Sequence, residues 1–237
     1  VMRVEDLENY GASLEMPKEA VQTQFRILWT ALRKQFGFLG ALGVFLDTYL
    51  IQRRLRRDFP ETRRRAAVIG KIIETQLFAL SGIFLALAKR LGREEAYEFL
   101  RNEVIYKTAL TSVPLIYQVA DLKKCEGDVF ENFKKMNIAL FERTTKDGTW
   151  LMEDYEDEPD KLTIDITTCA NVDLFSELNV PELGRFGCDH DVAGFAAIEK
   201  DVDCEFRRFC TIANGDDHCL FEFYRRGTAP DNAHLNI

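Results

Sequence analysis

Cysteine, histidine and aspartate side chains that could do chemistry gather in the last third of the chain. They stand in two groups, first Cys188, Asp189, His190 and Asp191 and then His218 and Cys219. A cysteine with a histidine base is the minimal apparatus for nucleophilic attack on an electrophilic carbon. The same residue types bind zinc. A divalent-metal site and a metal-free thiol–carboxylate site therefore both stay open.

The cysteines fall at the ends of predicted elements, where a rigid scaffold presents reactive groups. Cys169 ends a predicted strand, Cys188 immediately precedes a predicted short helix, and Cys219 begins the last strand. A thiol at a helix N-terminus feels a partial positive charge that favours the thiolate, although the neighbouring aspartates oppose this. We interpret Cys188 as the leading candidate for a nucleophile or ligand.

Packing is the alternative interpretation, because cysteine is among the most buried residue types. It is the favoured one for three cysteines: Cys125, Cys204 and Cys210. Asp189 or Asp191 could serve as a helix cap, and His190 could be an exposed residue at the helix start. His234 lies in a polar tail, where we expect no role.

The elements that position these groups are predicted to be an antiparallel sheet. Apolar and polar residues alternate along Leu162–Thr167, which is typical of a half-buried strand. Residues 150–156 are its predicted partner. Residues 204–213 and 218–225 form a second hairpin around Asn214-Gly215, a strong turn signal. Two short helices, at about 172–178 and 189–199, lie between the hairpins.

The first part of the chain is predicted to be helical. Apolar residues recur at helical spacing from Val21 to Phe36, and the next three glycines weaken the pattern before a helix resumes towards Arg57. Further helices are predicted over 60–91 (ended by Gly92), 93–111 (before a break at Pro114) and 128–141. The fold class is therefore α+β, with a helical part at 1–147 and a β-rich part at 148–237 that form one compact unit.

Composition restricts the class of protein. The 237 residues carry a net charge of −8, which argues against a nucleic-acid binder, whose affinity comes from neutralising phosphates. The six cysteines are not preceded by a secretory segment in a chain this large, so we expect reduced thiols and a cytoplasmic protein. Because the sequence begins at Val1, a targeting segment upstream stays open.

Charge and apolar residues are unevenly distributed. Seven arginines lie between Arg53 and Arg65, which is typical of a solvated helix face or of a surface for an anionic partner, and an acidic run at 153–160 offsets them. The apolar stretches 36–46 and 77–88 are too short to span about 30 Å of hydrocarbon as helices. We expect no membrane span, and buried or subunit-contact helices that suggest a homodimer.

Short motifs in the second part together resemble a known family. They are Thr168-Cys169, Glu177-Leu178, Pro181-Glu182-Leu183, Cys188-Asp189-His190-Asp191, Thr211-Ile212-Ala213-Asn214-Gly215-Asp216-Asp217-His218-Cys219 and Phe221-Glu222-Phe223. In this order and spacing they resemble the L-2-amino-thiazoline-4-carboxylic acid hydrolase family over about 150–225. A looser similarity links the chain to 4-vinyl reductase small-ligand-binding domains.

The resemblance implies a hydrolase that acts on a non-peptide C–N bond in a small cyclic amidine or related heterocycle. In the namesake reaction water adds to the amidine carbon of a thiazoline ring, and the ring opens to a carbamoyl cysteine. The roles that we expect on this basis are Cys188 as nucleophile, Asp191 with His190 as acid/base groups, and Cys169, His218 and Cys219 as pocket residues. An arginine from the helical part would hold the substrate carboxylate.

A small-ligand-binding or sensor module is the alternative. The same cysteines would then line a pocket or hold a structural metal such as zinc, and the arginine cluster would serve a partner. Substitution of Cys188 separates the two hypotheses, because an enzyme would keep its fold and lose turnover.

Overall fold

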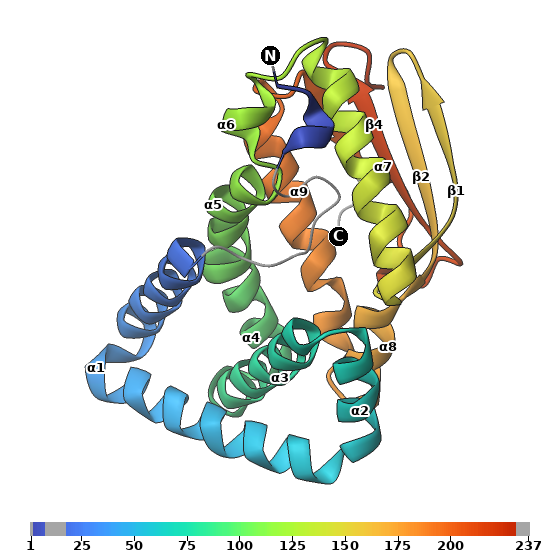
Figure 1. Cartoon of the computed structure of the whole chain (residues 1–237). Coiled ribbons are helices and arrows are strands. Elements are labelled where there is room, and N and C mark those ends of the chain that lie inside the picture. Colours follow the sequence, from blue (N-terminus) through green and yellow to red (C-terminus); the bar gives the residue numbers. More distant parts are fainter. Residues whose placement is uncertain (1, 8–17, 231–237) are drawn as a thin grey trace. The chain divides into compact units, whose positions relative to one another are not determined.

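The protein is described by a computed structural model that covers residues 2–7 and 18–230 (Figure 1). These residues belong to two compact units. The sheet unit contains the described residues up to Ala20, Ala109–Ala170 and the described residues from Cys188 onward, and the helical unit contains Val21–Thr108 and Asn171–Gly187. The fold class is α+β, as predicted. The units divide the chain at points other than the predicted boundary after residue 147.

Four strands form one antiparallel sheet with the order β1-β2-β4-β3. Their bounds are β1 Trp150–Glu158, β2 Lys161–Cys169, β3 Cys204–Arg207 and β4 Cys219–Arg225. The central strands β2 and β4 pair so that Ile166 lies opposite Cys219 and Leu162 lies opposite Phe223. The alternation predicted for Leu162–Thr167 is confirmed, because Leu162 and Ile164 are fully buried while Thr163 between them is only half-buried.

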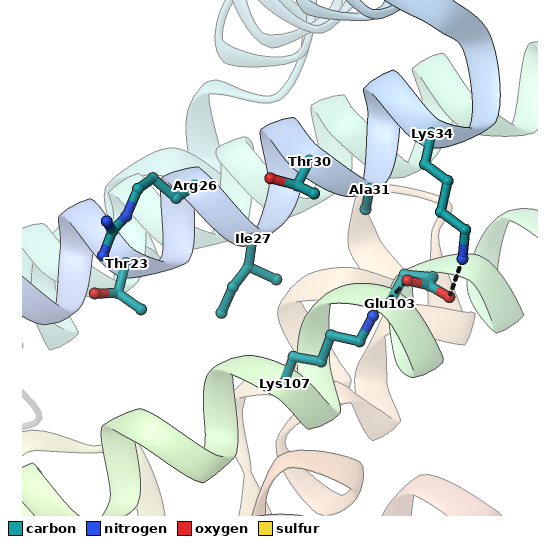
Figure 2. A pocket seen from close by; sticks show the side chains of 8 residues that line it. All are labelled: Thr23, Arg26, Ile27, Thr30, Ala31, Lys34, Glu103 and Lys107. Atoms are coloured by element: carbon teal, nitrogen blue, oxygen red, sulfur yellow. Dashed lines mark hydrogen bonds and ion pairs between the residues drawn. The ribbon is translucent and has the colours of Figure 1, made fainter.

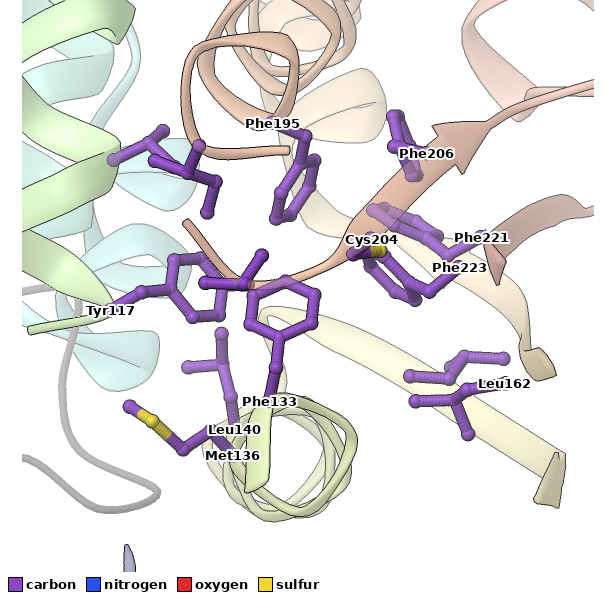
Figure 3. Close-up of a cluster of buried hydrophobic side chains, with 14 of the residues drawn as sticks. Tyr117, Phe133, Met136, Leu140, Leu162, Phe195, Cys204, Phe206, Phe221 and Phe223 are labelled. Carbon is purple, nitrogen blue, oxygen red and sulfur yellow. The ribbon is translucent and has the colours of Figure 1, made fainter. Parts of the chain in front are cut away.

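One face of this sheet is covered by helices that lie mostly in the same unit. They are α5 Tyr106–Ile116, α6 Val119–Leu122, α7 Val129–Asp147 and α9 Phe186–Ile198, with a 3-10 turn at Val4–Asp6. Phe195 of α9 is the centre of an aromatic cluster, with ring centroids 4.7 Å from Phe206 of β3 and 5.1 Å from Phe223 of β4 (Figure 3). Phe133 of α7 packs edge-on against Phe223. This cluster fixes α9, and with it the candidate site residues, against the sheet.

Helices α5 and α9 approach each other closely at Gly194. A Cβ atom at this position would lie 2.2 Å from Cγ2 of Val113, well inside van der Waals contact. Only glycine therefore lets the two helices pack at this separation. Since α9 carries Cys188, His190 and Asp191, this contact also sets the position of the site.

The helical unit is built from the remaining helices. They are α1 Lys18–Asp58, α2 Pro60–Ile69, α3 Lys71–Leu91, α4 Arg93–Leu100, a π turn at Arg101–Ile105, α8 Ala170–Glu177 and a 3-10 turn at Pro181–Arg185. Helix α1 breaks at Gly37, whose φ of 69° is accessible to glycine at little cost. The predicted weakening at the first of the three glycines is thus confirmed, and the helix resumes after it.

Three predicted elements differ from the structure. The single helix predicted over 60–91 is divided at Gly70, where the low helix propensity of glycine permits an extended residue. Pro114 does not end the helix but lies in the last turn of α5. Proline has no N–H, so the carbonyl of Leu110 loses its helical hydrogen bond, and because Leu110 is exposed this carbonyl can bind water instead. The predicted 128–141 helix continues to Asp147, and Gly148 caps it in a left-handed conformation.

The prediction of the second hairpin is correct for the pairing of its strands and wrong for the turn that connects them. Strands β3 and β4 pair antiparallel, with Cys204 opposite Arg225. However, β3 ends at Arg207, and Asn214 belongs to a 3-10 turn, Ile212–Asn214, that Gly215 caps. The connection is therefore a long loop, 208–218, and not a tight Asn-Gly turn. This loop carries much of the candidate site.

By length and composition, α3 is the one helix among the described residues that could cross a membrane. The apolar stretch 77–88 lies within this 21-residue helix. Less than half of the most apolar part of α3 is buried, including Phe78 and Phe84.

Candidate functional site

Two thiols meet at one threonine hydroxyl in the sheet unit. The Oγ1 atom of Thr211, in the β3–β4 loop, lies 3.3 Å from Sγ of Cys188 on α9 and 3.4 Å from Sγ of Cys219 at the start of β4. Thr211 is fully buried, and its backbone N–H donates to Oδ2 of Asp216 at 2.8 Å. The turn that Asp216 closes therefore holds the hydroxyl between the two sulfur atoms.

The hydrogen bonds around Thr211 favour a direction for its single proton. Oγ1 accepts a hydrogen bond from the N–H of Ala213 at 3.2 Å and one from the thiol of Cys219. With both lone pairs engaged, the hydroxyl proton is left to donate to Sγ of Cys188. The backbone N–H of Ile212 donates to Sγ of Cys219 at 3.2 Å. Cys188 is thus the sulfur that receives a donor hydroxyl.

A buried arginine stands beside these thiols. Arg208 is 1% exposed, and its Nη2 donates to Oδ2 of Asp191 at 2.9 Å. The guanidinium carbon lies 3.8 Å from the centroid of the Phe221 ring, a cation–π contact. The Nε–H group of Arg208 is buried and finds no hydrogen-bond partner among the described residues. An unsatisfied buried donor of this kind is costly, so it is a position where an acceptor would be bound favourably.

These neighbours act on the Cys188 thiol in opposite directions. Burial raises the pKa of Cys188 above its ordinary value, while the charge of Arg208 and the hydrogen bond from Thr211 lower it, and Asp191 raises it again. The net direction is upward. Cys188 also lies in the first turn of α9, which begins at Phe186, and not before the helix as predicted. The predicted stabilisation of a thiolate at the helix start is therefore outweighed by burial.

Arg208 keeps its charge in spite of burial. Burial lowers the pKa of its guanidinium, but Asp191 and the thiols of Cys188 and Cys219 raise it further, and the net direction is upward. A permanent positive charge thus lies behind the two sulfur atoms.

His190 does not face Cys188. Two residues along an α-helix correspond to about 200° of rotation, so His190 projects from the opposite side of α9. Its Nε2 lies 2.7 Å from Oγ of Ser112 on α5. Burial lowers the pKa of His190, and the nearby Asp191 opposes this shift. The predicted cysteine–histidine pair is therefore not formed, whereas Asp191, three residues after Cys188, lies on the same side of the helix.

The other predicted site residues lie further away. Cys169 ends β2 opposite Trp150, three residues beyond the partner of Cys219, which corresponds to about 10 Å along the strand. Nδ1 of His218 pairs with Oδ1 of Asp165 at 3.4 Å. The predicted packing of Cys204 is confirmed, since it is buried in the main core.

No disulfide joins the six cysteines, all of which the structure describes. Within residues 2–7 and 18–230, no three cysteine, histidine or acidic side chains come together as a metal site requires. His234 lies outside the described residues.

Arg208, Thr211 and Ser112 are the residues to which the sequence analysis gave no role. An arginine of the helical part that holds a substrate carboxylate stays a prediction, and Arg208 belongs to the β-rich part. The burial of Arg208 could have been predicted from the alternation along 204–208. A residue two positions after Phe206 faces the same side of the strand as that buried ring. Nothing in the sequence distinguishes Ser112 from other serines.

A separate pocket of about 370 Å³ lies in the helical unit, between α1 and the π turn (Figure 2). It is lined by Thr23, Arg26, Ile27, Thr30, Ala31, Lys34, Glu103 and Lys107. Glu103 pairs with Lys107 at 2.5 Å and with Lys34 at 3.9 Å, so its charge is already compensated. None of the predicted site residues lines this pocket.

Fold and site together define an α+β protein with a buried thiol–arginine centre between a helix and an antiparallel sheet. The chain belongs to the L-2-amino-thiazoline-4-carboxylic acid hydrolase family, whose model matches residues 70–223. This range includes every residue of the centre and excludes α1 and α2. The family name suggests hydrolase activity on a thiazoline-like substrate. No curated protein and no solved structure matches the chain.

Proposed function

We propose that this protein is a hydrolase that opens a small cyclic amidine, or a related C–N-containing heterocycle, that carries a carboxylate. The observation that carries the proposal is Arg208: a buried cation beside Cys188 with one carboxylate partner and an unsatisfied Nε–H. A substrate carboxylate is an acceptor of the right charge for this donor. Membership of the family supports the reaction class.

The side chains of the centre differ in exposure, and this difference suggests which of them react with a substrate and which support the reacting groups. Cys188 and Asp191 are half-buried, whereas Arg208, Thr211 and Cys219 are buried behind them. A small molecule that reaches the centre therefore meets the thiol and the carboxylate of α9 first. We assign nucleophilic attack to Cys188 and proton transfer to Asp191.

The proposed reaction proceeds in two steps. Sγ of Cys188 transfers its proton to Asp191 and attacks the amidine carbon, and the bond from this carbon to the leaving ring atom breaks as Asp191 returns the proton to that atom. Water then gives a proton to Asp191 and attacks the same carbon, and the bond to Sγ breaks as the thiol is protonated again. Arg208 and Thr211 stabilise the negative charge on sulfur in both steps.

Substitution of Cys188 tests the proposal. Purified Cys188→Ala and Cys188→Ser variants are compared with the unchanged protein on a panel of cyclic amidines with and without a carboxylate, and ring opening is followed by mass spectrometry. We expect both variants to fold and to lose turnover. Equal turnover in the Cys188→Ala variant and the unchanged protein would refute the catalytic assignment.

A small-ligand-binding module is the second candidate, and the raised pKa of Cys188 favours it, because a neutral thiol is a poor nucleophile. It predicts that the same amidines raise the melting temperature without being consumed. It also predicts that the Cys188→Ala variant keeps this shift.

A further inference from the structure

The second segment of α1, after Gly37, has two apolar faces. One face is buried in the helical unit through Ala41, Val44, Thr48 and Leu55. The opposite face exposes a row of residues spaced three or four apart, so they lie along one side of the helix. We call these the outer row: Leu39, Leu42, Leu46, Tyr49 and Leu50, which are 45% to 80% exposed.

The outer row is part of a concentrated patch. Of the thirteen large apolar residues that are exposed in the described parts of the chain, eight lie on α1. Single exposed apolar residues are common on protein surfaces, whereas a contiguous group marks an interaction site. The burial of the opposite face explains why this helix folds, and it leaves the outer row without an intramolecular role.

Positive charge continues the row towards the end of the helix. Arg53, Arg54 and Arg57 follow on the same side and are exposed. Arg54 and Arg57 share the carboxylate of Asp58, at 3.3 Å and 2.8 Å, and no described carboxylate lies within ion-pair distance of Arg53.

The excess of positive charge extends into α2. Residues 51–66 contain seven arginines against two acids, a net charge of +5 in a chain whose total is −8. Part of this charge is compensated, because Arg56 and Arg63 pair with Glu74 and Arg65 pairs with Glu177. The apolar outer row therefore ends in a basic segment of an acidic protein.

We propose that the outer row of α1 binds an anionic membrane surface, with the helix lying in the plane of the headgroups. The leucines would enter the acyl boundary, and Arg53, Arg54 and Arg57 would contact lipid phosphates. Tyr49 lies where the apolar and basic parts of the row meet, the depth that amphipathic aromatic rings prefer.

Charge complementarity favours this occupant over a second copy of the chain. A second copy of the chain would add its own arginines to the interface, whereas an anionic bilayer supplies negative charge at the basic end of the row. The matched family region starts at residue 70 and so excludes α1. Membrane binding through α1 can be measured apart from turnover at the thiol site.

Vesicle sedimentation of the full chain tests the proposal. The protein is mixed with phosphatidylcholine vesicles with or without phosphatidylglycerol, and the bound fraction is measured at low and high salt. We expect binding to the anionic vesicles alone, weakened by salt. The Leu39→Glu/Leu46→Glu variant should lose it, and Arg53→Gln/Arg54→Gln/Arg57→Gln should weaken it by about two orders of magnitude, about fivefold for each arginine.

Matched controls remove the same number of charges, or replace an exposed leucine by glutamate, elsewhere on the protein. Leu151→Glu changes an exposed leucine on β1, and Lys123→Gln/Lys124→Gln/Lys135→Gln removes three exposed cations of the sheet unit. We expect both to bind as the unchanged protein does, and all variants to keep its circular dichroism spectrum.

Two outcomes would overturn the proposal. One is that the unchanged protein stays in solution with anionic vesicles, or that the α1 variants bind like the controls. The other is that vesicles do not bind, while analytical ultracentrifugation shows a dimer that Leu39→Glu/Leu46→Glu dissociates. The outer row would then be an interface between copies of this chain.

Discussion

The guanidinium of Arg208 and the carboxylate of Asp191 form an ion pair at 2.9 Å that joins the β3–β4 loop to α9. The pair is asymmetric, because Arg208 is 1% exposed and the side chain of Asp191 is 23% exposed. The cation is thus held inside the protein, and the anion is the more exposed of the two charges. Substitution of Asp191 and substitution of Arg208 should therefore change the stability of the protein by different amounts.

Loss of the carboxylate should destabilise the protein. In an Asp191→Asn variant the buried guanidinium keeps its charge and loses the one ion-pair partner that it has among the described residues, which costs about 3 kcal/mol. The free energy of unfolding from urea denaturation at neutral pH measures this change.

Arg208→Met is the matched control, because methionine fills the space against Phe221 without a charge. We expect a small effect on stability from this variant, as is usual when apolar residues replace a buried ion pair. It should also remove most of the loss caused by Asp191→Asn in the double variant. A loss for Arg208→Met as large as that for Asp191→Asn would show that the pair itself stabilises the fold.

His190 should make stability depend on pH in the acid range. Its pKa is lowered by burial below the ordinary value of 6.5, so the unfolded state binds more protons than the folded state once the pH falls below that value. Stability is therefore full above the unfolded pKa and is lost as the pH falls through it. The slope can reach about 1.4 kcal/mol per pH unit.

Urea denaturation between about pH 5 and pH 7 checks this. We expect the His190→Gln variant, which can still hydrogen-bond to Ser112, to show a flatter profile. If both proteins give the same slope, another group causes the dependence.

The sheet could be predicted from the sequence because its signal is local. Alternation along Leu162–Thr167 follows from one face being buried, and this needs no knowledge of distant residues. The predicted turn between β3 and β4 was wrong because it, too, relied on a local signal. Asn214-Gly215 has the local signature of a hairpin, but Thr211 is drawn inward by contacts to Cys188 and Cys219, which are remote in sequence.

The candidate site was predicted in part. Cys188, Asp191 and Cys219 belong to the family motifs and lie around the buried centre, whereas Cys169 of the same motifs lies further along β2. The predicted pairing of His190 with Cys188 is not formed because residues two apart on an α-helix point to opposite sides, and α9 begins at Phe186, three residues before the predicted start. The contact of His190 with Ser112 depends on how α5 and α9 pack, which spacing along one helix does not reveal.

The close approach of α5 and α9 predicts an intolerance at Gly194. In a Gly194→Ala variant the added Cβ would clash with Val113, so the helices must separate or the side chains must move, which costs about 1–3 kcal/mol. The midpoint of thermal unfolding should fall, and the hydrogen bond between His190 and Ser112 should weaken. The double variant Gly194→Ala/Val113→Ala removes the 2.2 Å contact with Cγ2 and leaves the 2.9 Å contact with Cβ, so it should recover part of this stability. A further loss of stability would show that the strain does not come from this contact.

The hydroxyl of Thr211 should control how readily Cys188 reacts. It is oriented to donate to Sγ of Cys188, and this hydrogen bond lowers the pKa of a thiol that burial raises. A Thr211→Val variant keeps the shape and loses the donor. Alkylation of Cys188 by iodoacetamide at fixed pH should therefore become slower by about fivefold, with the modified residue identified by peptide mass mapping.

Thr211→Ser is the matched control for this prediction. Serine retains the hydroxyl that accepts from Ala213 and reaches both sulfur atoms, so its alkylation rate should stay close to that of the unchanged protein. The Arg208→Met variant should be slowed like Thr211→Val, because it removes the positive charge that also favours the thiolate. If Thr211→Val and Thr211→Ser react at the same rate, the hydroxyl only packs between the two thiols and does not act on Cys188.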